Sequence, residues 1–442
     1  MKLHALRANV RSRATGRRYS RPLIAGAVIA AAAISLTACG AGSSTTSSST
    51  KVKSITVLVE AGGHAELQPI ANLYKKDKGI TVNFVELPYN GLYNRVNSEL
   101  STGSVSFDVA SLDAVWLPAF AAGLDKLNSF YTPAVKKDNF ASVLQEAKVG
   151  ANYVGVPAFA NSEILYYRTD LFNDPANQAA FKAKYGYDLK PPTTWQQYTD
   201  VAAFFTKDGM YGAPLPGAEE TQFLAALSQA GEKNMVLNAK GTKSTLGDAD
   251  SLTALNYYTS LEKYGPSGAA SVDWNAAQNL YNQGKSAMML FWAHAYRQIP
   301  KDSPVYGKTG VAPMVGGPAG IAGVPGPYYL SIPKDGTHQA ASQAFVKFAY
   351  DHQALSANTS LGLVARISAL KANENKTGFE AYAPMIATLN APATISRPAD
   401  PNWQNIVNNV LIPMIQKAME PGANNAALLK AAAAQVDAIV AQ

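Results

Sequence analysis

Aromatic and carboxylate side chains that follow short apolar runs are the residues of this sequence best suited to binding or chemistry. Trp292 follows the apolar run 287–291, and Asp113 follows the run 107–112. Sugars present apolar C–H faces and hydroxyls, so a site for them needs aromatic platforms beside planar polar groups. A single Trp more often belongs to a core. Clusters at the carboxyl ends of strands favour a binding site, because ligands of open α/β sheets bind there.

Sequence signatures of enzymes are missing. The chain has no Gly-x-Ser-x-Gly, no His-Glu-x-x-His and no P-loop. The four His residues beyond residue 38 do not stand at metal-ligand spacing, and the single Cys, Cys39, excludes an internal disulfide or a Cys-based zinc site. No metal or cofactor is predicted. A glycosidase-like pair of carboxylates stays open, because such residues need to meet only in the folded chain.

The charge of the chain is unevenly placed. The formal net charge of the 442 residues is +7. Seven basic and no acidic residues lie within 1–38, and the remaining 31 Lys and Arg balance 31 Asp and Glu. A neutral body gives no electrostatic support for binding nucleic acid. The excess positive charge belongs to the N-terminal segment.

That segment reads as a processing signal. Its basic stretch precedes an apolar run, 23–34, which has the size of a signal h-region and is too short for a relaxed membrane span. The following Leu36-Thr-Ala-Cys39 resembles the bacterial lipobox, which implies lipidation of Cys39; the alternative is a small buried Cys. Residues 43–50 are all Ser or Thr, a composition typical of a flexible tether. We therefore expect a signal peptide at 1–38 and a tether at 39–53.

The body predicts an α/β fold. Residues 55–60, 80–87 and 107–112 read as strands separated by helical patterns, which indicates a parallel sheet with right-handed crossovers. Further strands are expected at 153–157, 164–167, 287–291 and 328–332, and a helix capped by Thr194 follows that residue. Residues 307–327, rich in Gly and Pro, read as a loop. Two helices are expected to end the chain, and Pro413 should kink or split the first.

Five phrases of the body together resemble the extracellular solute-binding proteins of ABC importers, in the sugar-binding branch and closest to the trehalose/maltose type. They occur in the order of that family and span nearly the whole body. They are Asp108-Val-Ala-Ser-Leu-Asp-Ala-Val-Trp116, continuing to Leu127; Gly155-Val-Pro-Ala-Phe-Ala-Asn161, continuing to Phe172; Pro191-Pro-Thr-Thr-Trp195; Gly284-Lys-Ser-Ala-Met-Met-Leu-Phe-Trp292; and Ser396-Arg-Pro398.

The resemblance implies a two-lobed periplasmic-binding-protein-like fold, with a hinge and a central ligand cleft. The N-terminal lobe would hold 54–159 and 327–366, and the C-terminal lobe 160–326 and 367–442. The chain would cross between the lobes near Pro157–Asn161, Gly326–Tyr329 and Gly362–Arg366. Closure of the cleft would present the loaded protein to a membrane permease.

The resemblance also carries the candidate ligand-binding residues. Asp113 would accept hydrogen bonds from sugar hydroxyls, or cap a helix. Trp116 would line the cleft or pack, and Phe159 would be a platform or pack in the hinge. Asn161 stands where relatives often carry Asp, so this contact lacks the charge.

Trp292 matches the stacking Trp of the family, and Arg397 matches an Arg that grips two vicinal hydroxyls; the alternatives are core packing and a surface ion pair. Tyr328 follows Gly326-Pro327, where relatives place an aromatic residue. Glu66, Glu220 and Arg366 are weaker matches. The other Trp residues are assigned to packing (Trp195 and Trp403) or to no role (Trp274).

The expected function is that of a sugar-binding lipoprotein, a monomer without enzymatic activity. It would be held by Cys39 on the outer face of the cytoplasmic membrane and would serve an ABC permease with its ATPase. Two other functions stay open. One is a lipid-anchored glycoside hydrolase, and the other is the same receptor fold with a polyol or another solute as its ligand.

Overall fold

The structure is a computed structural model that describes residues 52–441. The predicted signal peptide, the lipidation residue Cys39 and nearly all of the predicted tether lie outside the described residues. Among the residues that the structure describes, no helix is both long and apolar enough to cross a membrane.

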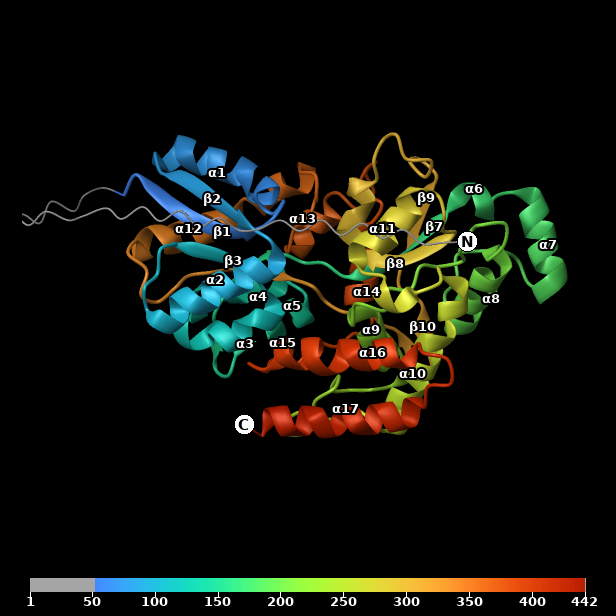
Figure 1. The fold of residues 1–442 in the computed structure, drawn as a ribbon. Helices are drawn as coiled ribbons and strands as arrows, with labels where there is room; N and C mark the ends of the chain where they lie inside the picture. Colours follow the sequence, from blue (N-terminus) through green and yellow to red (C-terminus); the bar gives the residue numbers. More distant parts are fainter. Residues whose placement is uncertain (1–51, 442) are drawn as a thin grey trace, which may run out of the picture. The chain divides into compact units, whose positions relative to one another are not determined.

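Strands and helices alternate along the body (Figure 1). The strands are β1 (Ser54–Glu60), β2 (Thr81–Leu87), β3 (Val109–Asp113), β4 (Lys148–Val149), β5 (Asn152–Tyr153), β6 (Val156–Phe159), β7 (Glu163–Arg168), β8 (Met288–Trp292), β9 (Thr309–Ala312), β10 (Gly316–Gly317), β11 (Gly320–Ile321) and β12 (Tyr328–Ser331). The helices of the first half are α1 (His64–Lys78), α2 (Tyr89–Thr102), α3 (Leu117–Phe120), α4 (Pro133–Lys137), α5 (Ala141–Glu146), α6 (Thr169–Phe172), α7 (Pro175–Tyr185), α8 (Trp195–Phe205) and α9 (Thr221–Ala230). Those of the second half are α10 (Ala249–Ser260), α11 (Trp274–Asn282), α12 (Gln339–Asp351), α13 (Ile367–Lys371), α14 (Tyr382–Leu389), α15 (Trp403–Ile406), α16 (Ile412–Ala418) and α17 (Asn425–Val440).

The first sheet has the strand order β2-β1-β3-β12-β6. As predicted, β1 pairs in parallel with β2 and β3, whereas β12 returns antiparallel between β3 and β6. Alternation along β1 places Val57 and Val59 in one apolar cluster with residues of α1 and α12, and Leu58 in the other cluster with residues of α2. The sheet is therefore covered on both faces, and the carboxyl ends of β1 and β3 meet at one edge.

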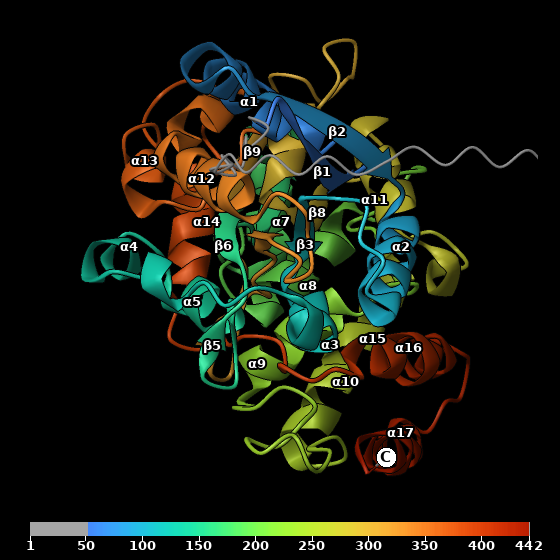
Figure 2. The ribbon, with the colours of Figure 1, turned by 90° about the vertical axis from the view of Figure 1, so that its left-hand side faces the viewer.

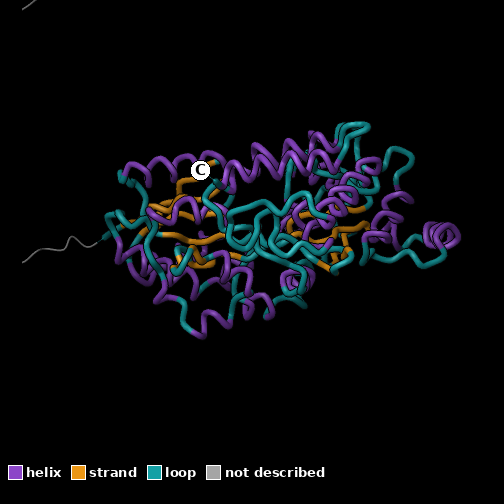
Figure 3. Tube along the Cα trace, turned by 90° about the horizontal axis from the view of Figure 1, so that it is seen from below, coloured by secondary structure: helices purple, strands orange, loops and turns teal. Residues whose placement is uncertain are grey.

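The second sheet is antiparallel, with the order β8-β7-β9 (strands orange in Figure 3). The expected loop over 307–327 is wrong here, because β9 pairs with β7 over four residues and β10 pairs with β11 as a hairpin. Gly310 is a residue of β9, and the Tyr167 ring packs directly against its backbone. A Cβ at Gly310 would lie 2.3 Å from that ring, so a larger residue would not fit there. The glycine that suggested a loop thus marks a close approach of a side chain to the backbone.

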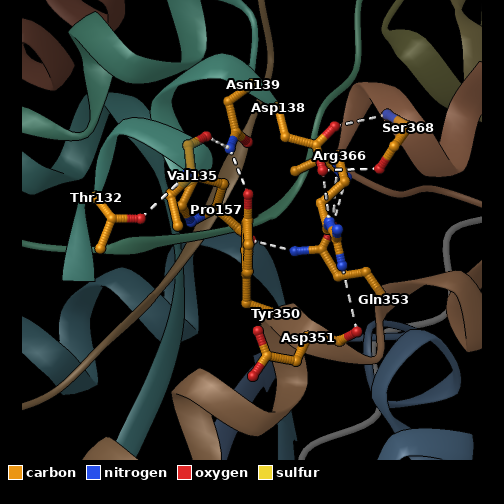
Figure 4. Close-up of polar contacts among 11 residues, drawn as sticks. Thr132, Val135, Asp138, Asn139, Pro157, Tyr350, Asp351, Gln353, Arg366 and Ser368 are labelled. Atoms are coloured by element: carbon orange, nitrogen blue, oxygen red, sulfur yellow. Dashed lines mark hydrogen bonds and ion pairs between the residues drawn. The ribbon is translucent and has the colours of Figure 1, made fainter.

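Three connecting segments run side by side between the two sheets. The Ala160 N–H donates to the Val364 carbonyl at 3.2 Å, and the Gly326 N–H donates to the Asn161 carbonyl at 2.9 Å. The buried Gln353 side chain joins two of these segments: its amide donates to the Pro157 carbonyl at 2.5 Å and accepts from the Ala365 N–H at 2.9 Å (Figure 4). These are the three stretches that the sequence assigned to the lobe crossings.

The C-terminal helical segment begins against the first-sheet elements and ends against the helices of the second sheet. Within this segment α15 contacts the turn after β3, and α16 contacts α10 and α17 (Figures 1 and 2). A π-helical turn over Val407–Leu411 separates α15 from α16. The predicted interruption at Pro413 is confirmed, because proline lacks the N–H of a regular helical bond and its ring clashes with the preceding turn.

Candidate functional site

A cavity of about 680 Å³ lies among the ends of β1, β3, β8 and β12 and the starts of α9 and α11. It is large enough for a small oligosaccharide or a comparable solute. Eight of the ten predicted ligand-binding residues line it. They are Glu66, Asp113, Phe159, Asn161, Glu220, Trp292, Tyr328 and Arg397.

Asp113 and Arg397 form a buried ion pair in the cavity wall. The Arg397 Nη2 donates to the Asp113 Oδ1 at 3.0 Å, and the Tyr89 hydroxyl donates to the Asp113 Oδ2 at 2.9 Å. The Arg397 N–H also donates to the buried Glu146 Oε1 at 3.1 Å. Asp113 in addition caps the short helical turn after β3, accepting from the Val115 N–H at 3.3 Å. Asp113 therefore both lines the cavity and caps the helical turn, the two alternatives that the sequence left open. Arg397 is buried, so its ion pair is not a surface one.

Tyr328 and Glu60 extend this wall. The Tyr328 hydroxyl donates to the Glu60 Oε2 at 2.5 Å, and its ring stacks on Phe159 with centroids 4.9 Å apart. Burial raises the pKa of Glu60, against the lowering effect of the Tyr328 hydrogen bond. Because β12 pairs in register with β3 and β6, Tyr328 lies opposite Asp113 on one side and Phe159 on the other. The sheet itself places these three residues together.

Asn161 of the first crossing segment contacts His294, which lies in the helical turn after β8. The Asn161 Nδ2 and the His294 Nδ1 are 3.0 Å apart, and burial lowers the pKa of His294 to about 4. The imidazole is therefore neutral near pH 7, and its Nδ1 accepts from the Asn161 amide. An Asn at this position supplies a donor to a neutral His, which an Asp carboxylate could not do.

Two indoles form the aromatic part of the wall. Trp292 ends β8 and Trp274 begins α11; their ring centroids are 6.0 Å apart at an interplanar angle of 60°. Trp292 also lies under the crossing segment, where a Cβ at Gly326 would come 2.5 Å from its ring. Gly326 is thus required for the backbone to pass over the indole. Both rings are only partly buried and line the cavity.

Several carboxyl groups of the cavity have raised pKa values because they are partly removed from water. Burial raises the pKa of Glu66 to about 8, although Glu66 Oε1 accepts a hydrogen bond from the Thr359 hydroxyl at 3.1 Å. Burial also raises the pKa of Glu219 to about 7, assisted by the charges of Glu220 and Asp273. Burial raises the pKa of Glu220 as well.

Two of the sequence-predicted residues lie away from the cavity lining. Trp116 is fully buried between Tyr89 and Tyr93 and donates from Nε1 to the Gln404 Oε1 at 3.3 Å, so it packs the first-sheet core against α15. Arg366 pairs with Asp138 at 2.8 Å beside a second cavity of about 510 Å³ (Figure 4). The resemblance predicted that both residues would bind the ligand. In the structure neither side chain lines the cavity: Trp116 contacts Gln404, and Arg366 contacts Asp138.

Sequence reasoning also missed lining residues. Trp274, which had no assigned role, lines the cavity together with Tyr89, Glu219 and Asp273. Trp403 is 1% exposed and packs in the core, as predicted, and it also contributes to the cavity lining. Asp273 caps α11, accepting from the Ala276 N–H at 2.8 Å. The sequence offered two signals for these residues: the pair Asp273-Trp274 at the start of a helix, and the pair Glu219-Glu220 before another helix. Neither pattern is specific for a binding site.

The described residues match known proteins in sequence and in fold. Residues 59–355 match the family model described as bacterial extracellular solute-binding protein. A probable ABC transporter-binding protein of Deinococcus radiodurans is 28% identical over 275 residues, which is 58% of this chain and 62% of that protein. A maltooligosaccharide ABC transporter solute-binding lipoprotein of Streptococcus pneumoniae is 27% identical over 331 residues, 72% of this chain and 73% of that protein. The chain thus spans about three fifths of the length of the Deinococcus relative.

Solved structures match most of the body. The structure of maltose-bound MalE3 from T. maritima has a TM-score of 0.74 and 22% identity, covering 87% of this chain and 99% of that one. A solute-binding protein of Agrobacterium radiobacter in complex with ribitol has a TM-score of 0.72 and 22% identity, covering 88% and 99%. These likenesses confirm the predicted fold class, α/β with the two-lobed periplasmic-binding-protein-like arrangement.

Proposed function

Because this chain belongs to the family of bacterial extracellular solute-binding proteins, we propose that it captures a polyhydroxylated solute, a sugar or a polyol, for import through an ABC permease. The observation that carries this proposal is the cavity itself. Its wall combines partly exposed indole rings with a buried Asp–Arg pair, the combination that sugar hydroxyls and C–H faces require.

The ligand would be held between two lobes. We assign 54–159 and 327–366 to the first lobe and 160–326 and 367–442 to the second, with one amendment. Arg397 and Gln404 contact Asp113 and Trp116, so the segment around them belongs with the first lobe. The three adjacent crossings, tied by Gln353, are suited to act as the hinge.

The partners and location follow from the same proposal. Names of relatives such as the Streptococcus pneumoniae lipoprotein support anchoring of this chain by lipid at Cys39, on the outer face of the bacterial cytoplasmic membrane. A monomeric receptor would deliver its ligand to the permease and its ATPase. The site would act by binding and closure, with no covalent step.

A polyol is the second candidate ligand. The relatives include a mannitol-binding protein of Pseudomonas aeruginosa, 26% identical over 222 residues, and the matching fold from Agrobacterium radiobacter holds ribitol. Polyols offer the same hydroxyls as sugars but no rigid ring face, so they would gain less from stacking on Trp292.

A ligand panel tests the proposal. Thermal unfolding of the protein with maltose, trehalose, mannitol and ribitol should show a saturable stabilisation, about 2.7 kcal/mol at a hundredfold excess over Kd. Trp292→Phe keeps a ring for stacking, whereas Trp292→Ala removes it, and the two variants should separate a sugar from a polyol. A flat response to every sugar and polyol would contradict the proposal. Release of chromophore from aryl glycosides would instead favour the hydrolase.

A further inference from the structure

One side of the cavity wall is acidic and lacks basic partners. We call it the acidic side: Glu219, Glu220 and Asp273 with Trp274 and Trp292. The first two residues directly precede α9, Asp273 and Trp274 begin α11, and Trp292 ends β8. Among residues 52–441, none of these three carboxyl groups lies within ion-pair distance of a Lys, Arg or His side chain.

The cavity wall holds more acidic than basic side chains. Its lining includes six carboxyl side chains and a single guanidinium, that of Arg397. That guanidinium is already committed to Asp113 at 3.0 Å and lies in the field of Glu146. The one imidazole of the lining, His294, is kept neutral by burial. Arg397 also lies in the field of Glu220, but among the described lining residues no cationic side chain forms an ion pair with any carboxyl group other than Asp113.

Two buried polar atoms of lining residues also lack hydrogen-bond partners among the described residues. Glu66 is only 3% exposed and lines the cavity, yet its Oε2 has no hydrogen-bond partner among the described residues. Arg397 Nε is in the same condition. Buried polar atoms without partners cost free energy, so their retention in a binding cavity points to a polar ligand that pairs with them.

A neutral ligand would leave the acidic side uncompensated. Sugar hydroxyls donate hydrogen bonds to carboxylates, but they bring no charge, and a bound ligand expels the water that screens these groups. An ammonium group offsets the carboxylates directly. It is attracted as well to the faces of indoles such as Trp274 and Trp292. The raised pKa of Glu219, caused by burial and by Glu220 and Asp273, agrees with a group that a cation would stabilise.

We propose that the preferred ligand of this cavity is a polyhydroxylated cation, a saccharide or cyclitol that carries a basic amine. Its ammonium group lies beside Glu219 and Asp273 and over the indoles, while its hydroxyls meet Asp113 and Arg397. This inference rests on the proposed function and specifies the solute class.

Matched ligands that differ only in the substituents at C2 of their rings test it. Calorimetric titration at neutral pH compares three forms of each sugar: the hydroxyl form, the amine and the uncharged N-acetyl form. The disaccharide series is cellobiose, its diamine chitobiose and N,N′-diacetylchitobiose, and the monosaccharide series is glucose, glucosamine and N-acetylglucosamine. Trehalose and its 2-amino derivative extend the comparison to an α,α-linked skeleton. The amine form should bind about tenfold or more tightly than both uncharged forms in at least one series, and this preference should shrink with added salt.

Variants locate the effect. Glu219→Gln and Asp273→Asn should reduce the preference for the amine over the uncharged ligand to about threefold or less. Asp302→Asn, at an exposed carboxylate outside the cavity lining, is the matched control and should change neither. Circular dichroism of each variant checks that it is folded.

The outcomes separate this inference from the proposed function. Tighter binding of the uncharged sugars overturns the inference and leaves the function standing, as does an amine preference that survives both substitutions. Calcium binding at these carboxylates without any amine effect also overturns it. If neither charged nor uncharged sugars and polyols bind, both the inference and the proposed function fail.

Discussion

Asp113 and Glu219 both line the cavity, yet their carboxyl groups have opposite surroundings. Asp113 receives a guanidinium from Arg397 and a hydroxyl from Tyr89, on a sheet edge that fixes both partners. Among the described residues, Glu219 has no basic partner within ion-pair distance, and it neighbours two further acidic residues. The paired side, formed by Asp113, Arg397 and Tyr89, contains an ion pair of its own, whereas the acidic side contains none among the described residues. Stability should therefore depend on the first and ligand choice on the second.

Removing the guanidinium gives the largest expected effect. Arg397→Ala leaves the Asp113 carboxylate buried without its cation, which should lower the free energy of unfolding by ~3–5 kcal/mol. Chemical denaturation monitored by fluorescence measures it. Arg95→Ala, which breaks the surface pair of Arg95 with Glu99, is the control and should cost less than ~1 kcal/mol. Equal losses in both variants would show that the paired side does not stabilise the fold.

Removing an indole should act on binding first. Trp292→Ala deletes a partly buried platform of the cavity, and we expect a loss of affinity of about tenfold or more, which corresponds to ~1.4 kcal/mol. Trp116→Phe is the contrast, since Trp116 packs outside the lining; its affinity should stay within about twofold of the native value. Titration calorimetry with the tightest ligand of the panel measures both. A greater loss in the Trp116 variant would place the ligand elsewhere.

Removing the Tyr328 hydroxyl, which extends the cavity wall beside the paired side, should have a smaller effect on stability. Tyr328→Phe keeps the stack on Phe159 but removes the donor to Glu60, so the free energy of unfolding should fall by about 1 kcal/mol. The pKa of Glu60 should rise further, because the hydrogen bond that lowered it is gone. Chemical denaturation measures the change in the free energy of unfolding, and titration of the carboxyl groups by NMR measures the pKa of Glu60. An unchanged Glu60 titration would mean that the hydroxyl does not hold this carboxylate.

A further expected change is in the pH profile of stability. The folded pKa of Glu219 is about 7, above its ordinary 4.5, so the folded protein binds more protons than the unfolded chain between these values. Its contribution is fully present below about pH 4.5 and is lost as the pH rises through 7. Glu219→Gln should flatten that part of the profile of thermal midpoints, and Asp302→Asn should not. An unchanged slope in the Glu219 variant would contradict the burial of this carboxyl.

Local patterns predicted most of the fold. The strands β1, β2 and β3, the Thr194 cap and the break near Pro413 all follow from residues close in sequence. The strand β9 was missed because its glycines suggested a loop, whereas Gly310 is set by the Tyr167 ring packed on it. Packing between distant segments is invisible to local periodicity.

The candidate site was predicted in outline and corrected in detail. The resemblance led to the region of Asp113, Trp292 and Arg397, and all three line the cavity. It could not tell that Trp116, one turn beyond Asp113, points into the core, or that Arg366 turns to Asp138. Sequence distance says where a residue stands on an element; neighbouring elements decide which way its side chain is directed.

The sequence by itself determined the alternation of strands and helices, the neutral body behind a basic N-terminal segment, and the family. These depend on composition, on periodicity and on phrases that each occupy one stretch of chain. Only the tertiary structure decided which carboxyl groups share a cavity and which of them have a cation. Asp113 and Arg397 are 284 residues apart, and Glu219 meets Asp273 only where α9 and α11 begin side by side at the cavity. The interaction between two charged side chains depends on the distance between them in space, and for residues far apart in sequence only the tertiary structure sets that distance.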